Sequence, residues 1–191
     1  MRPAPAGGRR APALEQLSLG LAAIAPRWSL SRLVLRSVHR ARIIERLVFV
    51  RRYYPELDRS TVRVGLALKR GVLGWGSLDP ERPGVWVRPR RLHYFTIAHE
   101  LTHLLQARRL VPRGERACDL WSLARSPLLV DHPPGYLALP RAFRAQARVE
   151  SWQSRVLHEE ARRAIEARAG GERRYLRRFE REVARALSAR R

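Results

Sequence analysis

Residues 96–106, Thr-Ile-Ala-His-Glu-Leu-Thr-His-Leu-Leu-Gln, place three ionisable side chains within an apolar segment. Hydrophobic residues recur there at helical spacing, which predicts a helix over residues 92–106. A helix this apolar packs against the interior of a protein, and it takes His99, Glu100 and His103 with it. Burying two imidazoles and a carboxylate without partners is costly. The fold must therefore supply an enclosed polar site beside this helix.

The spacing of these three side chains indicates a metal centre. His99 and His103 are four residues apart, so they lie on one face of the helix and can present imidazole nitrogens to one ion. Glu100 projects from the adjacent side, where its carboxylate can take a proton from a metal-bound water. A zinc ion, Zn²⁺, with one open coordination position suits this arrangement. The alternative is a pair of exposed histidines beside a solvated glutamate, which the apolar neighbours disfavour.

A second predicted helix, over residues 115–125, brings acidic residues toward this centre. The turn at residues 111–114 lets that helix run back antiparallel beside the first. Glu115 then lies nearest His103, and Asp119, one helical turn further on, approaches His99. A carboxylate at Asp119 can accept the second N–H of an imidazole and so fix the orientation of the ring.

The pattern His-Glu-x-x-His followed by Glu-x-x-x-Asp resembles that of the gluzincin metallopeptidases, and at this length the chain resembles the small cytoplasmic minigluzincins. The resemblance covers roughly residues 60–125. It implies a zinc-dependent peptidase in which Glu100 is the catalytic general base and Asp119 supports a ligand histidine. It also implies a strand at the sheet edge that pairs with the substrate backbone, at Val85, Trp86 and Val87. The zinc ligands that it implies are His99, His103 and Glu115.

Two points leave alternatives open. The gap between His103 and Glu115 is shorter than gluzincins usually show, so Asp119, Cys118 and His132 remain alternative third ligands. The SprT-like proteases, which act on DNA-bound proteins, form the nearest competing family and take a third histidine after the motif. His132 is the candidate for that role, although its long spacing and its Pro-Pro neighbours fit poorly.

Peptide hydrolysis also requires a group that stabilises the developing oxyanion. His132 and Tyr136 lie in a stiff loop rich in proline and glycine after the ligand helices, and either can serve as this transition-state stabiliser. The alternative is that both residues make only local hydrogen bonds.

The remaining patterns predict an α+β fold, predominantly α, with a zincin-like core, a small antiparallel sheet, an active-site helix and a C-terminal helical layer. Residues 1–12 are expected to form a disordered basic tail, residues 13–138 the metallopeptidase core, and residues 139–191 a helical segment packed on the core. Strands are predicted at residues 61–68 and 85–88, and helices at 14–24, from Ser29 or Ser31 to about Tyr54, and from Pro140 onward. Trp152 and Phe179 are expected to be buried, and residues 140–191 to wall one side of the cleft.

Composition bears on partners and location. The chain of 191 residues has 39 basic and 17 acidic residues, and Lys69 is its single lysine. This arginine excess is dispersed, which predicts at most weak, nonspecific nucleic-acid binding. The alternative function is a nucleic-acid-associated protein with a structural zinc site. The single cysteine, and the lack of an apolar run long enough to span a bilayer, favour a cytoplasmic protein without a membrane partner. We expect a monomer whose partner is a peptide or protein substrate.

Overall fold

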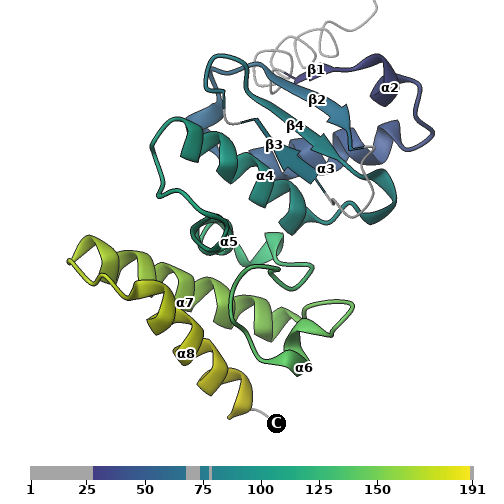
Figure 1. The fold of residues 1–191 in the computed structure, drawn as a ribbon. Coiled ribbons are helices and arrows are strands. Elements are labelled where there is room, and N and C mark those ends of the chain that lie inside the picture. The colour runs from purple at the N-terminus through teal and green to yellow at the C-terminus, as the bar shows by residue number, and fades with distance from the viewer. Residues whose placement is uncertain (1–27, 68–73, 78, 190–191) are drawn as a thin grey trace, which may run out of the picture.

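The protein combines helices with one small sheet. A computed structural model describes residues 28–67, 74–77 and 79–189 (Figure 1), so the predicted tail at residues 1–12 and the predicted helix at 14–24 lie outside the described residues. Within the described ranges there are seven α-helices and four strands, which confirms the predicted α+β class with mostly helix. In chain order the elements are β1 (Trp28–Leu30), α2 (Arg32–Leu35), α3 (Arg40–Arg51), β2 (Val62–Leu66), β3 (Gly74–Gly76), β4 (Gly84–Val87), α4 (Tyr94–Ala107), α5 (Glu115–Leu123), α6 (Arg141–Arg144), α7 (Ser151–Ala169) and α8 (Tyr175–Ser188).

The sheet is mixed, and the prediction of an antiparallel sheet was wrong. Its strand order is β1-β2-β4-β3, in which β1 and β2 pair in parallel, as do β2 and β4, while β3 and β4 are antiparallel. The strand β1 was not expected, because a helix beginning at Ser29 or Ser31 was predicted there and no strand. α2 and α3 connect β1 to β2, and a crossover of this kind makes the two strands parallel.

The predicted edge strand was also wrong. Val85, Trp86 and Val87 belong to β4, which is bordered by β2 on one side and by β3 on the other. β3 is one of the two edge strands of the described sheet, the other being β1, and it contacts α4 directly. Two glycines permit this close approach: a Cβ on Gly76 would lie 2.6 Å from the carbonyl oxygen of Glu100.

The single helix expected before Pro55 is two helices. Ser31 does act as an N-cap, since its side chain accepts a hydrogen bond from Val34 N, but the helix it caps has only four residues. The long apolar pattern corresponds to α3, which buries Ile43, Leu47 and Val50. C-terminal to Pro140 the prediction likewise merged two helices, α6 and α7.

Side chains of the sheet and of α3 and α4 form one hydrophobic core. One face of the sheet contributes buried valines, and α3 and α4 cover that face with leucines and isoleucines (Figure 1). The sheet residues in this core are Val62, Val64, Val85 and Val87. This packing fixes the position of α4, the helix that carries the histidines.

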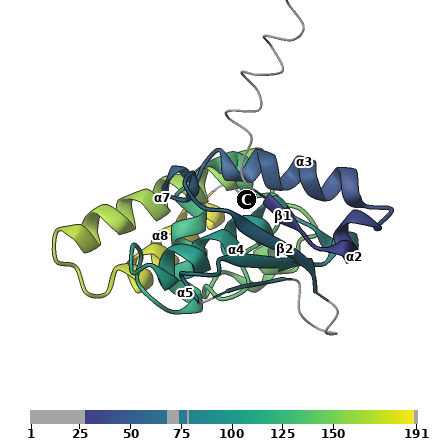
Figure 2. The same ribbon diagram turned by 90° about the horizontal axis from the view of Figure 1, so that it is seen from above.

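A second core lies among the C-terminal helices. α7 and α8 pack side by side (Figures 1 and 2), and Phe143, Leu157 and Phe179 are buried between them and α5. Phe179 is buried as expected, whereas Trp152 is only half-buried. None of the described helices is long and apolar enough to cross a membrane.

Candidate metal centre

Two helices bring the predicted site residues together. α4 carries His99 and His103, and α5 begins at Glu115 and carries Asp119 one turn later. α5 crosses α4 instead of running antiparallel beside it, since Figure 1 shows α5 nearly end-on and α4 across the page. Glu115 is therefore nearest His99: its Oε2 lies 3.0 Å from His99 Nε2 and 3.4 Å from His103 Nε2. The expected approach of Asp119 to His99 is present as well.

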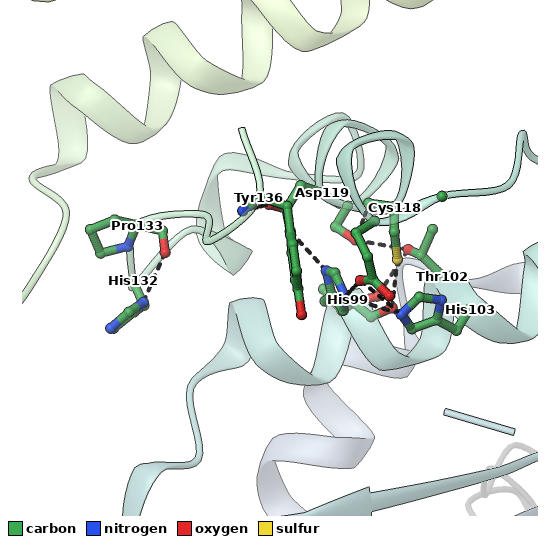
Figure 3. Close-up of polar contacts among 12 residues, drawn as sticks. His99, Thr102, His103, Cys118, Asp119, His132, Pro133 and Tyr136 are labelled. Carbon is green, nitrogen blue, oxygen red and sulfur yellow. Dashed lines mark hydrogen bonds and ion pairs between the residues drawn. The ribbon is translucent and has the colours of Figure 1, made fainter. Parts of the chain in front are cut away.

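Hydrogen bonds fix the orientation of both imidazole rings. His99 Nδ1 lies 2.8 Å from Oδ1 of the buried Asp119 (Figure 3). His103 Nδ1 lies 2.8 Å from Gln106 Oε1. The amide nitrogen of Gln106 donates to two backbone carbonyls in the turn before α5, so its Oε1 is the atom left to accept. A carboxylate and an amide oxygen only accept, which places a proton on each Nδ1. In neutral imidazoles both Nε2 atoms are then bare acceptors.

Three acceptor atoms consequently face one another. The Nε2 atoms of His99 and His103 are 3.1 Å apart, and Glu115 Oε2 completes a triangle with sides of 3.0 and 3.4 Å. Three lone pairs at this separation repel one another unless a cation lies between them. Tetrahedral Zn²⁺ with ligand bonds of about 2.0–2.1 Å sets neighbouring ligand atoms about 3.3 Å apart. The donor set and its dimensions therefore fit zinc.

Cys118 is a fourth group near this cluster. Its sulfur lies within 4.8 Å of the ring nitrogens of both histidines, so His99, His103 and Cys118 together could also hold a metal ion. The thiol donates to the backbone oxygen of His99 at 3.1 Å (Figure 3). Burial, with smaller effects from nearby carboxylates, raises the pKa of Cys118 well above its usual value, which disfavours the thiolate that zinc binds. Glu115 fits the third position better.

The electrostatic surroundings differ between the two histidines. Burial alone lowers the pKa of His99, but the hydrogen bond and negative charge of Asp119, aided by Glu100 and Glu115, raise it overall. The pKa of His103 is lowered, chiefly by burial and then by the charge of His99. Asp119 thus places its negative charge beside one imidazole, as a carboxylate that supports a metal ligand does.

Glu100 points toward β3 rather than into the triangle of acceptors. Its side chain is 5% exposed, and Oε2 is buried without a hydrogen-bond partner among the described residues. A Cβ on Gly74 would lie 2.9 Å from Glu100 Oε1 and 3.0 Å from Trp86 O, so the glycine lets the carboxylate lie close against β3. Burial raises the pKa of Glu100 to about 7. A carboxylate with this pKa can both take up and release a proton near neutral pH.

A cavity of about 300 Å³ opens beside His99 and Glu100. His132, Pro133, Gly135 and Tyr136 form one of its walls. None of the described residues from 140 to 189 lines the cavity, so the expectation that the C-terminal helices wall the cleft was wrong. The Tyr136 ring stacks on His99, with ring centres 5.5 Å apart (Figure 3). Tyr136 N donates to Asp119 Oδ2 at 2.8 Å, which anchors this loop at the base of the site.

His132 lies apart from the cluster of ligand atoms. Its Nδ1 donates to the backbone oxygen of Pro133 at 2.9 Å (Figure 3). The centres of the His132 and His93 rings are 4.4 Å apart. The neighbouring Asp131 accepts hydrogen bonds from Tyr94 N and Phe95 N at the start of α4. The loop therefore places His132 at the cavity wall and not among the candidate ligands.

Buried hydroxyl groups hold α4 against α5 from behind the site. Thr102 Oγ1 lies 2.8 Å from Ser122 Oγ and 3.0 Å from the hydroxyl of Tyr54, which also donates to Ala98 O at 2.7 Å. Because all three side chains are buried, these contacts form in a region of low dielectric, where each bond is strong. They fix where α5 crosses α4 and hence where Glu115 meets the histidines.

Sequence reasoning missed Gln106 and the two glycines of β3. Gln106 follows His103 by three residues, a spacing at which two side chains on a helix are in contact. This spacing could have identified Gln106 as a hydrogen-bond partner of His103. Gly74 and Gly76 alternate around Trp75, which is the pattern of a strand with one bare face.

Comparisons with known proteins gave no match: no protein-family model, curated protein or solved structure is significantly similar to the chain.

Proposed function

We propose that this protein is a zinc-dependent metallopeptidase with a zincin-like core of gluzincin type. The observation that carries the proposal is the close triangle formed by His99 Nε2, His103 Nε2 and Glu115 Oε2, which are all acceptors when the rings are neutral. Such a triangle calls for a cation, and its sides suit tetrahedral zinc. The buried carboxylate of Glu100 adjoins it, which is the combination that a hydrolytic site needs.

The residues divide the chemistry among them. His99, His103 and Glu115 would hold the zinc ion, which would supply a Lewis acid for activating water and for polarising a substrate carbonyl. Glu100 accepts the proton of the attacking water on its unpartnered Oε2 and later delivers it to the leaving amine. Asp119 keeps the His99 ring in place. Tyr136 is better placed than His132 to stabilise the developing oxyanion, since its ring lies over His99.

A peptide is the substrate that the surroundings suit best. β3 is an edge strand of the described sheet and lies against α4, so its backbone can pair with an extended chain that passes Glu100. In this role β3 replaces the strand at residues 85–87. The cavity beside His99 then receives one side chain of that peptide.

Two variants test the reaction. Glu100→Gln keeps the size of the side chain and removes its basicity, so peptide hydrolysis should fall about 100- to 10,000-fold while the bound zinc per chain stays the same. Hydrolysis of a casein or peptide library, run beside metal analysis, gives both quantities. Glu159→Gln on the exposed side of α7 is the matched control. Turnover by Glu100→Gln at the wild-type rate would contradict the mechanism.

Metal analysis of three further variants tests the ligand set. Glu115→Ala should empty the site, whereas Asp119→Ala should weaken zinc binding about 10- to 100-fold by freeing the His99 ring. Cys118→Ala should leave zinc bound, because the thiol is engaged with His99 O. A site emptied by Cys118→Ala and full in Glu115→Ala would instead indicate a structural zinc site, the alternative function.

A further inference from the structure

The sheet has a second face, opposite α3 and α4, and an aromatic pair occupies it. Val85 and Val87 point into the core, so Trp86 between them lies on the opposite face. Trp75 of β3 is directly opposite Trp86 in the register, and the two indoles stack with centroids 3.8 Å apart and planes 3° from parallel. Figure 1 shows α3 and α4 behind the sheet and this face turned toward the viewer. We call the two indoles the tryptophan platform.

The backbone beneath the tryptophan platform is shaped to hold it. A Cβ on Gly65 of β2 would overlap the indole of Trp86, and a Cβ on Gly84 would lie 2.9 Å from its Cη2. Trp86 therefore lies flat over two glycines, and Trp75 stacks on it. Trp75 nevertheless remains 48% exposed. One aromatic surface is thus held in a fixed orientation while a large part of it meets solvent, an arrangement that core packing alone does not require.

Arginines flank the tryptophan platform along the strands. Arg63 lies two residues before Gly65 on the same face, is exposed, and its guanidinium donates to the backbone oxygen of Arg82 at 3.3 Å. Arg88 follows Trp86 by two residues in extended backbone, which puts it on this face as well. Two residues of a strand span about 7 Å. An arginine therefore lies to either side of the indoles at a distance close to the spacing of neighbouring phosphates in a single strand. The chain as a whole has a net charge of +22.

We propose that the tryptophan platform binds single-stranded nucleic acid. One base stacks on Trp75, and the phosphates to either side of it meet Arg63 and Arg88. Bases of any sequence present a π-face, so this mode of binding is tolerant of sequence, and it excludes duplexes because their bases are already stacked. The charge pattern favours this ligand over a neutral sugar or an apolar peptide, which would use the indole without needing the arginines.

Fluorescence anisotropy of a labelled oligothymidylate of about ten nucleotides tests this inference with the full chain. At about 50 mM salt, Trp75→Ala should weaken binding about 5- to 100-fold, and Trp75→Phe, which keeps an aromatic face, should weaken it less. Arg63→Ala should reduce the slope of log affinity against log salt by about one. Leu110→Ala removes an equally exposed apolar side chain between α4 and α5 and should change nothing. A thermal melt of each variant establishes that it is folded.

Several outcomes would overturn the proposal. They are wild-type affinity in Trp75→Ala, equal affinity for a duplex of the same length, equal competition by polyglutamate, and no binding at about 50 mM salt. Loss of binding in Arg178→Ala on α8 with Trp75→Ala unaffected would place the contact on the C-terminal helices instead. The Glu100→Gln variant should bind the oligonucleotide like the wild type, so this test is independent of the proposed peptidase reaction.

Discussion

Asp119 and Gln106 determine what His99 and His103 can do. Each accepts a hydrogen bond from the Nδ1–H of one imidazole. Together they orient the two Nε2 atoms toward Glu115. The predicted antiparallel packing of the two helices, which set Glu115 nearest His103, was not observed, since Glu115 lies nearest His99. The role of Asp119 was predictable in part, because helix periodicity places it one turn after Glu115 on the same face of α5. The role of Gln106 was not, since its amide depends on the carbonyls of a turn whose path the sequence does not specify.

Glu100 should make the metal-free protein less stable at high pH. Its pKa in the folded state, about 7, exceeds the reference value of 4.5. Between these values the unfolded chain has released the proton while the folded chain retains it, so stability falls as pH rises. The full difference corresponds to about 3 kcal/mol. In the presence of a chelator, Glu100→Gln should therefore be more stable than the wild type by up to about 3 kcal/mol at pH 8.

Chemical denaturation at several pH values measures this effect. Protonated glutamate and glutamine are nearly isosteric, so the two proteins should converge in stability at pH 4.5 and below. Glu159→Gln, at an exposed position of α7, should follow the wild type throughout. A stability difference between Glu100→Gln and the wild type that does not change with pH would indicate that packing, and not the buried charge, is responsible.

At the scale of elements, helices were easier to predict than strands. The periodicity of residues 92–106 and 115–125 gave α4 and α5 nearly at their observed bounds. The sheet was only partly predictable, because β1 and β3 have three residues each and are too short for an alternating pattern to show. Which strands lie next to each other in a sheet is determined by tertiary packing. The sequence could therefore not identify Val85–Val87 as an internal strand.

The approach of β3 to α4 should depend on Gly76. Alanine there would put a Cβ 2.6 Å from Glu100 O and 2.9 Å from the Cβ of His103, so the strand must move away. Overpacking of this kind costs about 1–3 kcal/mol. Gly76→Ala should therefore lower the free energy of unfolding by that amount and weaken zinc binding, as measured by denaturation and metal titration.

Gly170→Ala is the matched control for this substitution. A Cβ on Gly170 would meet its nearest neighbour at 3.5 Å, an ordinary contact, and its φ of −78° suits alanine. This variant should keep the stability and the zinc affinity of the wild type. Wild-type zinc affinity in Gly76→Ala would show that β3 can shift without disturbing the histidines.

The described part of the molecule has two hydrophobic cores, and Trp121 of α5 packs against both. One face of α5 carries Glu115 and Asp119 to the histidines, and Leu120 and Leu123 on the same helix pack among α7 and α8. Arg116 of α5 also pairs with Glu180 of α8 at 2.6 Å. The C-terminal helices thus support the helix that carries the site while contributing none of the candidate ligand atoms.

This arrangement predicts that a substitution in the C-terminal core will lower stability without removing the candidate metal ligands. Phe179 is 1% exposed among α7, α8 and α5, and truncating a buried phenylalanine to alanine costs about 3–5 kcal/mol. Phe179→Ala should lower the melting temperature strongly, while Arg178→Ala, an exposed neighbour on the same helix, should change it little. Below its melting transition Phe179→Ala should still bind one zinc ion per chain, because α4 and α5 hold the ligands. Loss of zinc at temperatures where circular dichroism shows a folded chain would mean that the C-terminal core sets the position of Glu115.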